Sequence, residues 1–111
     1  MRTLAASLWC LVAIPATLVA EPVDYGRDIK PILHGRCFAC HGALRQKAGL
    51  RLDAVQLIRQ GGKSGPAIVP GKSADSLLIE KVTGNDRSRM PPKSEGSPLS
   101  GKGREIGRAH V

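Results

Sequence analysis

Cys37, Cys40 and His41 form a Cys-x-x-Cys-His sequence, whose residue types and spacing point to a specific chemistry. This pentapeptide is the attachment motif of c-type haem. Two intervening residues let one backbone turn present both thiols to the two neighbouring vinyl groups of a porphyrin edge. The next residue, a histidine, then lies beneath the iron and can bind it through a neutral imidazole nitrogen. We therefore predict one covalent haem c held by Cys37 and Cys40, with His41 as the proximal iron ligand.

Two other interpretations of the cysteine pair stay open. A disulfide or redox-active dithiol is typical of a Cys-x-x-Cys beside a strand of a βαβ unit, and the sequence shows no such unit. A structural zinc site needs four ligands, and only His34 stands close enough to join Cys37, Cys40 and His41. Haem is favoured because it also accounts for the adjacent histidine.

Met90 is the best candidate for the sixth iron ligand, which an electron-transferring haem requires. It is the only methionine after the initiator, and it stands in the polar, proline-broken sequence Arg89-Met90-Pro91-Pro92. A methionine in such a loop does not belong to the apolar face of a helix or strand, so we predict that it binds the haem iron. The rival ligands are His110 and His34, and the latter is too near Cys37 to reach the opposite haem face easily.

The first twenty residues have the layout of a signal peptide. A basic residue precedes an uncharged run over residues 4–20, which ends in a small residue before Glu21. The alternative is an uncleaved anchor, but a run interrupted by Pro15 is short for a transmembrane helix. We predict a signal peptide over residues 1–20, export to the periplasm or cell envelope, and no stable membrane span after cleavage. Cys10 then leaves with the signal peptide.

The chain after residue 20 is poor in residues that build a core. Tyr25 and Phe38 are its only aromatic residues, and it contains all 13 glycines and seven of the eight prolines. A domain of this size seldom gains more than a few kcal/mol from its core alone. We therefore expect a bound haem to complete the core.

Short helices separated by loops are expected to position the motif. Each should begin after a capping side chain and show apolar residues at helical spacing. The expected helices, with their caps, cover residues 25–35 (Asp24), 54–60 (Asp53) and 74–82 (Ser73). Pro31 should kink or shorten the first helix. Gly61 and Gly84 should end the other two.

Residues 64–71 are expected to form a loop that lines the haem. Two prolines and two glycines exclude a regular helix there, although the centre of the segment is apolar. In this loop the Pro66 carbonyl is placed to accept a hydrogen bond from the second imidazole nitrogen of His41. Such a contact fixes the orientation of a histidine ligand.

These features together resemble the planctomycete-type cytochrome c domain. The matching stretches cover most of residues 23–92 and read VDYGRDIKPILHGRCFACHG, KAGLRLD, GGKSGPAIVPGKSADSLLI and RMPP. The resemblance implies an all-α, class I-like cytochrome c fold of short helices and loops wrapped around one covalent haem. It favours Arg51 over Arg59 as the partner of a haem propionate. It also implies downstream domains in a longer polypeptide.

The end of the chain departs from this family pattern after residue 100. The family continues with an acidic helix start and an amphipathic helix, whereas residues 105–111 here match one reading frame of a common sequencing adapter. We expect a cytochrome c domain over residues 21–104 that is incomplete at its C-terminus, and a non-native tail over residues 105–111 in which His110 has no function. The C-terminal helix that packs against residues 24–35 should then be missing, and the fragment should be unstable.

The charge of the exported chain is a weak guide to its partners. After residue 20 there are 16 basic and nine acidic residues, a net charge of +7. This surplus is either an ordinary solvated surface or a means of steering toward an acidic redox partner. Nucleic-acid binding is disfavoured, because the basic residues are scattered and aromatic residues for stacking are few.

The sequence therefore predicts an electron-carrier module rather than an enzyme. The alternative is a haem enzyme or ligand sensor, peroxidase-like in its chemistry, with an open distal site. Ligation by Met90 decides between them, because a bound thioether closes the iron to other ligands. A zinc or disulfide binding module is the third hypothesis.

Overall fold

Short helices joined by loops make up the fold, in a computed structural model that describes residues 13–19 and 21–110. The α-helices are α1 (Lys30–Arg36), α2 (Val55–Gln60), α3 (Leu77–Thr83) and α4 (Gly101–His110). Single turns precede or link them: η1 (Tyr25–Ile29), η2 (Lys47–Gly49), η3 (Ser73–Asp75) and η4 (Lys93–Glu95). The described residues form no strand, and the all-α prediction is confirmed.

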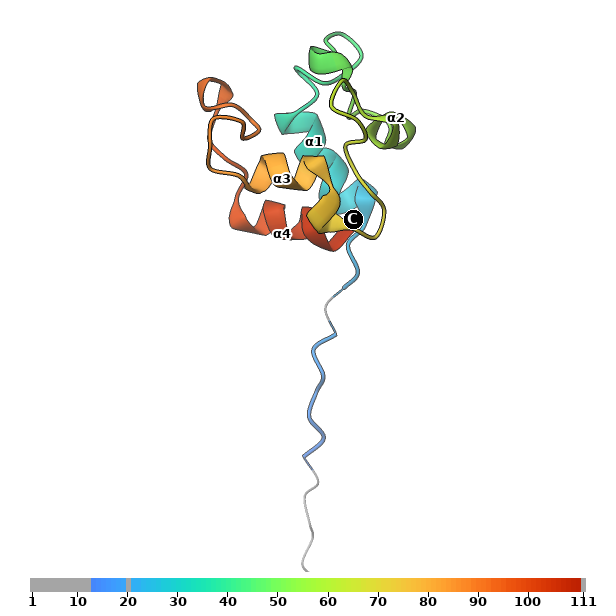
Figure 1. The fold of residues 1–111 in the computed structure, drawn as a ribbon. Coiled ribbons are helices and arrows are strands. Elements are labelled where there is room, and N and C mark those ends of the chain that lie inside the picture. The colour runs from blue at the N-terminus through green and yellow to red at the C-terminus, as the bar shows by residue number, and fades with distance from the viewer. Residues whose placement is uncertain (1–12, 20, 111) are drawn as a thin grey trace, which may run out of the picture.

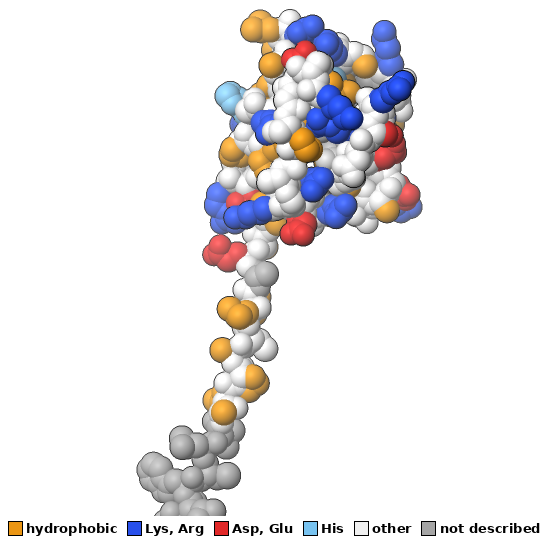
Figure 2. Space-filling model, turned by 90° about the vertical axis from the view of Figure 1, so that its left-hand side faces the viewer, with side chains coloured by type: hydrophobic (Ala, Val, Ile, Leu, Met, Phe, Trp, Pro, Cys, Tyr) orange, Lys and Arg blue, Asp and Glu red, His pale blue; other side chains and the backbone are white. Residues whose placement is uncertain are grey.

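Residues 13–19 extend away from the helical body without forming a helix or strand (Figure 1). Apolar side chains project from this segment (Figure 2), and Ile14, Leu18 and Val19 are each more than four-fifths exposed. The remainder of the predicted signal peptide, with Cys10, lies outside the described residues. Within the described part, no helix is both long and apolar enough to cross a membrane. The signal peptide itself stays a prediction.

The first helix begins as a π-helical turn and becomes α-helical only from Lys30. Asp24 caps it as predicted, because its Oδ1 accepts a hydrogen bond from the Arg27 N–H at 2.7 Å. The Lys30 N–H donates to the carbonyl of Tyr25, five residues back. Pro31 explains the wider turn, since its ring clashes with the carbonyl four residues earlier in a regular α-helix and its nitrogen has no proton. The expected distortion at Pro31 is confirmed.

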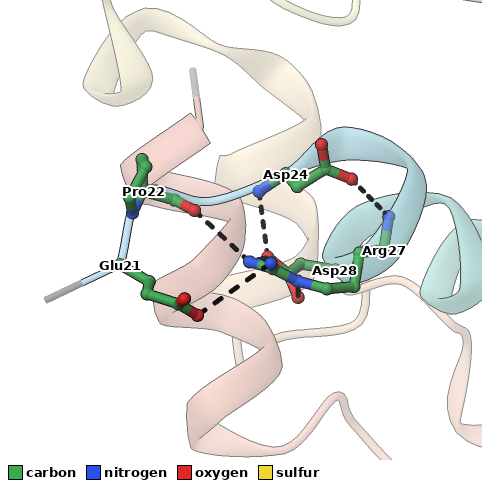
Figure 3. Close-up of polar contacts among 5 residues, drawn as sticks. All are labelled: Glu21, Pro22, Asp24, Arg27 and Asp28. Carbon is green, nitrogen blue, oxygen red and sulfur yellow. Dashed lines mark hydrogen bonds and ion pairs between the residues drawn. The ribbon is translucent and has the colours of Figure 1, made fainter.

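A compact polar network fixes this turn to the segment before it (Figure 3). The Arg27 guanidinium donates to both oxygens of Asp28, at 2.8 and 2.9 Å, and to the Pro22 carbonyl at 3.3 Å. Asp28 also accepts a hydrogen bond from the Asp24 N–H at 2.9 Å. The contact with Arg27 and then the Asp24 N–H lower the pKa of Asp28 to about 2.

The predicted cap of α2 is wrong. This helix begins after Ala54 without a side-chain cap. The Asp53 carboxylate instead accepts hydrogen bonds from the Arg51 guanidinium at 2.6 and 2.9 Å. The predicted end is confirmed, because Gly61 has φ of 75° and a Cβ there would lie 1.9 Å from the Gly65 carbonyl oxygen. A side chain cannot be accommodated in so close a backbone contact.

The predicted cap of α3 is also wrong, since Ser73 starts η3 and Ser76 is the residue directly before α3. The Ser76 hydroxyl is buried and does not cap the helix. It accepts a hydrogen bond from the Val69 N–H at 2.9 Å and donates to the Lys72 carbonyl at 2.9 Å. Ser76 therefore stabilises the preceding loop. Gly84 follows α3, as predicted.

The C-terminal helix that the sequence suggested was missing is present as α4. The Ser100 hydroxyl accepts a hydrogen bond from the Gly103 N–H at 3.1 Å, which satisfies one donor of the first turn. The helix contacts η1 and α3 and lies beside α3 in Figure 1. Three glycines among its ten residues make it a poor helix former on local preference alone. Tertiary contact therefore supports it, and the origin of residues 105–111 stays a prediction.

The buried core is small and aliphatic. It joins α1 and α2 to the loops that follow each of them, through Leu33, Leu52, Ile58 and Ala67. Tyr25 and Phe38, the aromatic residues of the chain after residue 20, pack against it only half-buried. This arrangement holds the segment around residues 37–41 in place without a large aromatic centre.

Asp28→Asn should destabilise the folded chain at neutral pH but not near pH 2. The pKa of Asp28 falls from an ordinary value of 3.8 to about 2 on folding, so the ionised carboxylate stabilises the fold above about pH 4. That contribution is lost as the pH falls through about 2. Thermal melts followed by circular dichroism at several pH values measure the difference between variant and wild type. Asp75→Asn is the control, because its carboxylate has no partner among the described side chains. A difference independent of pH would contradict the assignment.

Candidate haem site

Cys37, Cys40, His41 and Met90 line a single cavity of about 590 Å³. This volume lies within the range of about 300–1,000 Å³ that is usual for small-molecule and cofactor sites. Apolar side chains from three segments contribute to the wall: Leu50, Leu52, Ala67, Leu77, Leu78 and Val82. The structure thus brings together the four residues that the sequence singled out as haem and iron ligands.

A helical turn at the end of α1 presents the motif to this cavity. The Cys37 N–H donates to the Leu33 carbonyl at 2.9 Å, which continues the hydrogen bonding of α1. The His41 N–H donates to the Cys37 carbonyl at 2.9 Å, and the Cys40 N–H donates to the same oxygen at 3.2 Å. These bonds form the single backbone turn that the spacing of the motif requires.

Gly42 allows this turn to close, and the sequence analysis missed its role. The residue is buried, and a Cβ there would lie 2.5 Å from the Phe38 carbonyl oxygen. Real Cβ atoms do not approach backbone oxygens so closely, so the position requires glycine. The position of Gly42 directly after His41 is the sequence feature from which this role could have been predicted.

The Nδ1 atom of His41 is buried and has no hydrogen-bond partner among the described residues. The predicted bond to the Pro66 carbonyl is therefore not formed. Pro66 is exposed and does not line the cavity, although its neighbours Gly65 and Ala67 do. The donor set itself, two thiols and one imidazole in the same cavity, fits a metal held in a covalently attached cofactor.

Met90 lies at the edge of the cavity and not in the core. Its side chain is 36 % exposed, and its N–H donates to the Lys81 carbonyl at 2.9 Å, which ties the segment to α3. A core gap-filling role is excluded by this exposure.

His34, a rival iron ligand, does not line the cavity. Its exposed ring packs edge-on against Phe38 with centroids 5.5 Å apart. The side chain of His110, the other rival, lies outside the described part. The described residues include no group of three or more His, Cys, Asp or Glu placed to hold a metal ion.

Arg51, the predicted propionate partner, does not line the cavity. Its neighbours Leu50 and Leu52 do line the cavity. Because successive side chains of an extended segment point to opposite sides, Arg51 points away from the cavity and binds Asp53. The basic side chains at the cavity are instead Arg36, Lys47, Lys63 and Lys81. The sequence analysis missed these four. Arg36 could have been found from its place beside Cys37, whereas the others are brought in by tertiary structure.

Cys37 and Cys40 are free thiols in this structure. Burial raises the pKa of the Cys37 thiol to about 11, and the nearby charge of Arg36 only partly opposes the rise. The thiol therefore stays protonated at neutral pH.

In the haem-free protein, Cys37 should react with iodoacetamide far more slowly when folded than when denatured, because the thiolate is the reactive form. A rise in pKa from 9.0 to about 11 lowers the thiolate fraction at pH 8 by on the order of a hundredfold. Mass spectrometry of the peptide containing Cys37, in a Cys40→Ser variant, gives the rate at each pH. The rate in the folded protein should keep rising up to about pH 11. Equal rates in the folded and denatured protein would refute the shift.

Comparison with known proteins agrees with this geometry. The family model for planctomycete cytochrome C matches residues 37–94, more than half of the chain, and this segment contains Cys37, Cys40, His41 and Met90. No curated protein and no solved structure is similar enough to count as a match. The match and the cavity together establish that the chain belongs to the planctomycete cytochrome C family.

Proposed function

We propose that this chain is a c-type cytochrome module that binds one haem c through Cys37 and Cys40 and carries single electrons in the cell envelope. The observation that carries the proposal is the shared cavity of the Cys-x-x-Cys-His turn and Met90. A bound haem supplies an iron atom that takes up and releases one electron. His41 offers it an imidazole nitrogen held by the backbone turn, and Met90 offers a thioether from the opposite end of the matched segment.

The second candidate function is a haem enzyme or ligand sensor with an open distal site. Its support is the partial exposure of Met90, which leaves the thioether accessible at the cavity edge. The electron-carrier function is favoured because Met90 is also tied to α3 through its own N–H, so that the residue is held at the cavity. The same proposal includes export of the chain, with a cleaved signal peptide over residues 1–20. It also includes a longer polypeptide with downstream domains.

Covalent haem is expected after expression with the c-type cytochrome maturation machinery. The wild-type chain should give a haem-stained band on a denaturing gel, and Cys37→Ala and Cys40→Ala should each weaken or abolish it, because each removes one thioether bond. His34→Ala is the matched control, since His34 lies outside the cavity and should not affect staining. An unstained wild-type band, or zinc in the purified protein, would overturn the proposal.

The spectrum of the oxidised haem-loaded chain separates the two candidate functions. An electron carrier should show the methionine-to-iron charge-transfer band and bind added cyanide poorly, and Met90→Ala should reverse both properties. A wild-type chain that lacks the band and binds cyanide readily would instead favour the enzyme or sensor.

The proposed partner is an acidic redox protein that approaches the cavity. Four basic side chains and one acidic side chain, Glu95, line this cavity. Basic side chains are also spread over the face drawn in Figure 2. Clustered charge of one sign at a cleft raises the association rate of an oppositely charged partner. The cavity rather than the net charge is thus the expected source of steering.

Electron transfer to an anionic iron complex should slow as salt is added, because screening shortens the reach of the basic side chains. The second-order rate constant from stopped-flow measurements should fall on the order of tenfold between low and high ionic strength. Lys63→Gln combined with Lys81→Gln should flatten this dependence, whereas Lys30→Gln, outside the cavity, should leave it nearly unchanged. A salt dependence that the cavity variants do not alter would refute this steering role.

A further inference from the structure

Arg89 stands out because the fold buries its charge. It is 8 % exposed, and it is the one charged residue that is buried in the part of the chain the structure describes. The ion pairs among the described residues involve Arg27 and Arg51, so no carboxylate neutralises Arg89 there. Burial of an unpaired charge is costly, and arginine cannot escape the cost by losing its proton. Its guanidinium must therefore make contacts that offset the free-energy cost of burial.

The guanidinium of Arg89 joins the two ends of the loop that follows Met90. Its Nη1 donates to the Pro91 carbonyl at 2.9 Å, and its Nη2 donates to the Gly96 carbonyl at 3.2 Å. Pro91 and Pro92 have no N–H groups, so the backbone there has few donors of its own. The fixed fork of the guanidinium supplies two.

The loop that Arg89 holds is part of the cavity wall. Met90, Pro91, Pro92 and Glu95 all line the cavity. Met90 is thus fixed on one side, through its N–H, to α3, and the chain directly after it is fixed by Arg89. Within the loop itself, the Glu95 N–H donates to the Pro92 carbonyl at 2.9 Å.

A second arginine links the same loop to the haem attachment motif. Arg36, directly before Cys37, donates from Nη2 to the Ser97 carbonyl. The carbonyls of Gly96 and Ser97 therefore each receive a guanidinium, one from the Met90 segment and one from the end of α1. Gly96 has φ of 142°, a conformation that side-chain-bearing residues rarely adopt. The loop is thereby joined to both sides of the cavity.

We propose that Arg89 is a positioning residue, which holds the loop after Met90 so that the Met90 thioether stays within reach of the haem iron. This inference rests on the proposed function, in which Met90 is the distal ligand. The alternative is that Arg89 only stabilises the fold. The two roles differ in a measurable way, because only positioning affects how often the iron loses its methionine.

The test uses the full haem-loaded chain and compares Arg89→Gln with Arg87→Gln. Arg87 is an exposed arginine two residues away, without a partner among the described residues, and makes a matched control. Arg89→Gln should keep covalent haem but weaken the methionine-to-iron charge-transfer band. Its affinity for cyanide should rise by about tenfold, in proportion to the larger fraction of chains with Met90 detached. Arg87→Gln should match the wild type in both measurements.

Three further results keep the inference falsifiable. An Arg89→Gln chain with a lower melting temperature but an unchanged band and cyanide affinity would overturn the positioning role and leave the proposed function intact. Met90→Ala with an unchanged spectrum would show instead that Met90 is not the ligand, and both proposals would fail. If Arg89→Gln yields no haem-loaded protein, Arg89→Lys decides. Its ammonium keeps the charge but not the fork, so a weakened band is expected and an unchanged one would refute the inference.

Discussion

The helical turn that extends α1 through His41 is the constraint on which the rest of the structure depends. Its backbone hydrogen bonds direct two thiols and an imidazole toward one cavity, and Gly42 allows the chain to leave the turn against the Phe38 carbonyl. A side chain at Gly42 would force the turn open. The turn forms from neighbouring residues, whereas the other walls of the cavity come from later segments of the chain. Those segments must therefore pack around the two thiols and the imidazole that the turn presents.

Backbone hydrogen bonds between successive cavity-lining segments help to hold those walls. The Leu52 N–H donates to the His41 carbonyl at 2.9 Å, the Leu78 N–H to the Ala67 carbonyl at 2.8 Å, and the Met90 N–H to the Lys81 carbonyl at 2.9 Å. Each bond fastens one cavity-lining segment to its neighbour. This scaffold suits a chain whose buried side chains are few and aliphatic, since it does not depend on a large apolar core.

The sequence predicted the helices better than their beginnings. Helices form where expected before Gly61 and Gly84, because apolar spacing and a following glycine are local features. The predicted cap at Asp53 was wrong because its carboxylate binds Arg51 instead of the helix. The predicted cap at Ser73 was wrong because α3 starts after Ser76. The α4 helix was not predicted, since its glycines disfavour it, and contact with η1 and α3 supports it in the fold.

The sequence alone places two thiols and an imidazole within five residues, and a single turn brings these groups together whatever the rest of the chain does. It also singled out Met90, through the scarcity of other thioethers. Only the tertiary structure decided which charged groups surround them. It turns Arg51 away, brings Lys63 and Lys81 to the cavity, and buries Arg89 against two carbonyls. Arg51 and Arg89 find these partners within a few residues along the chain, but the path of the backbone around the cavity decides which partner each guanidinium reaches.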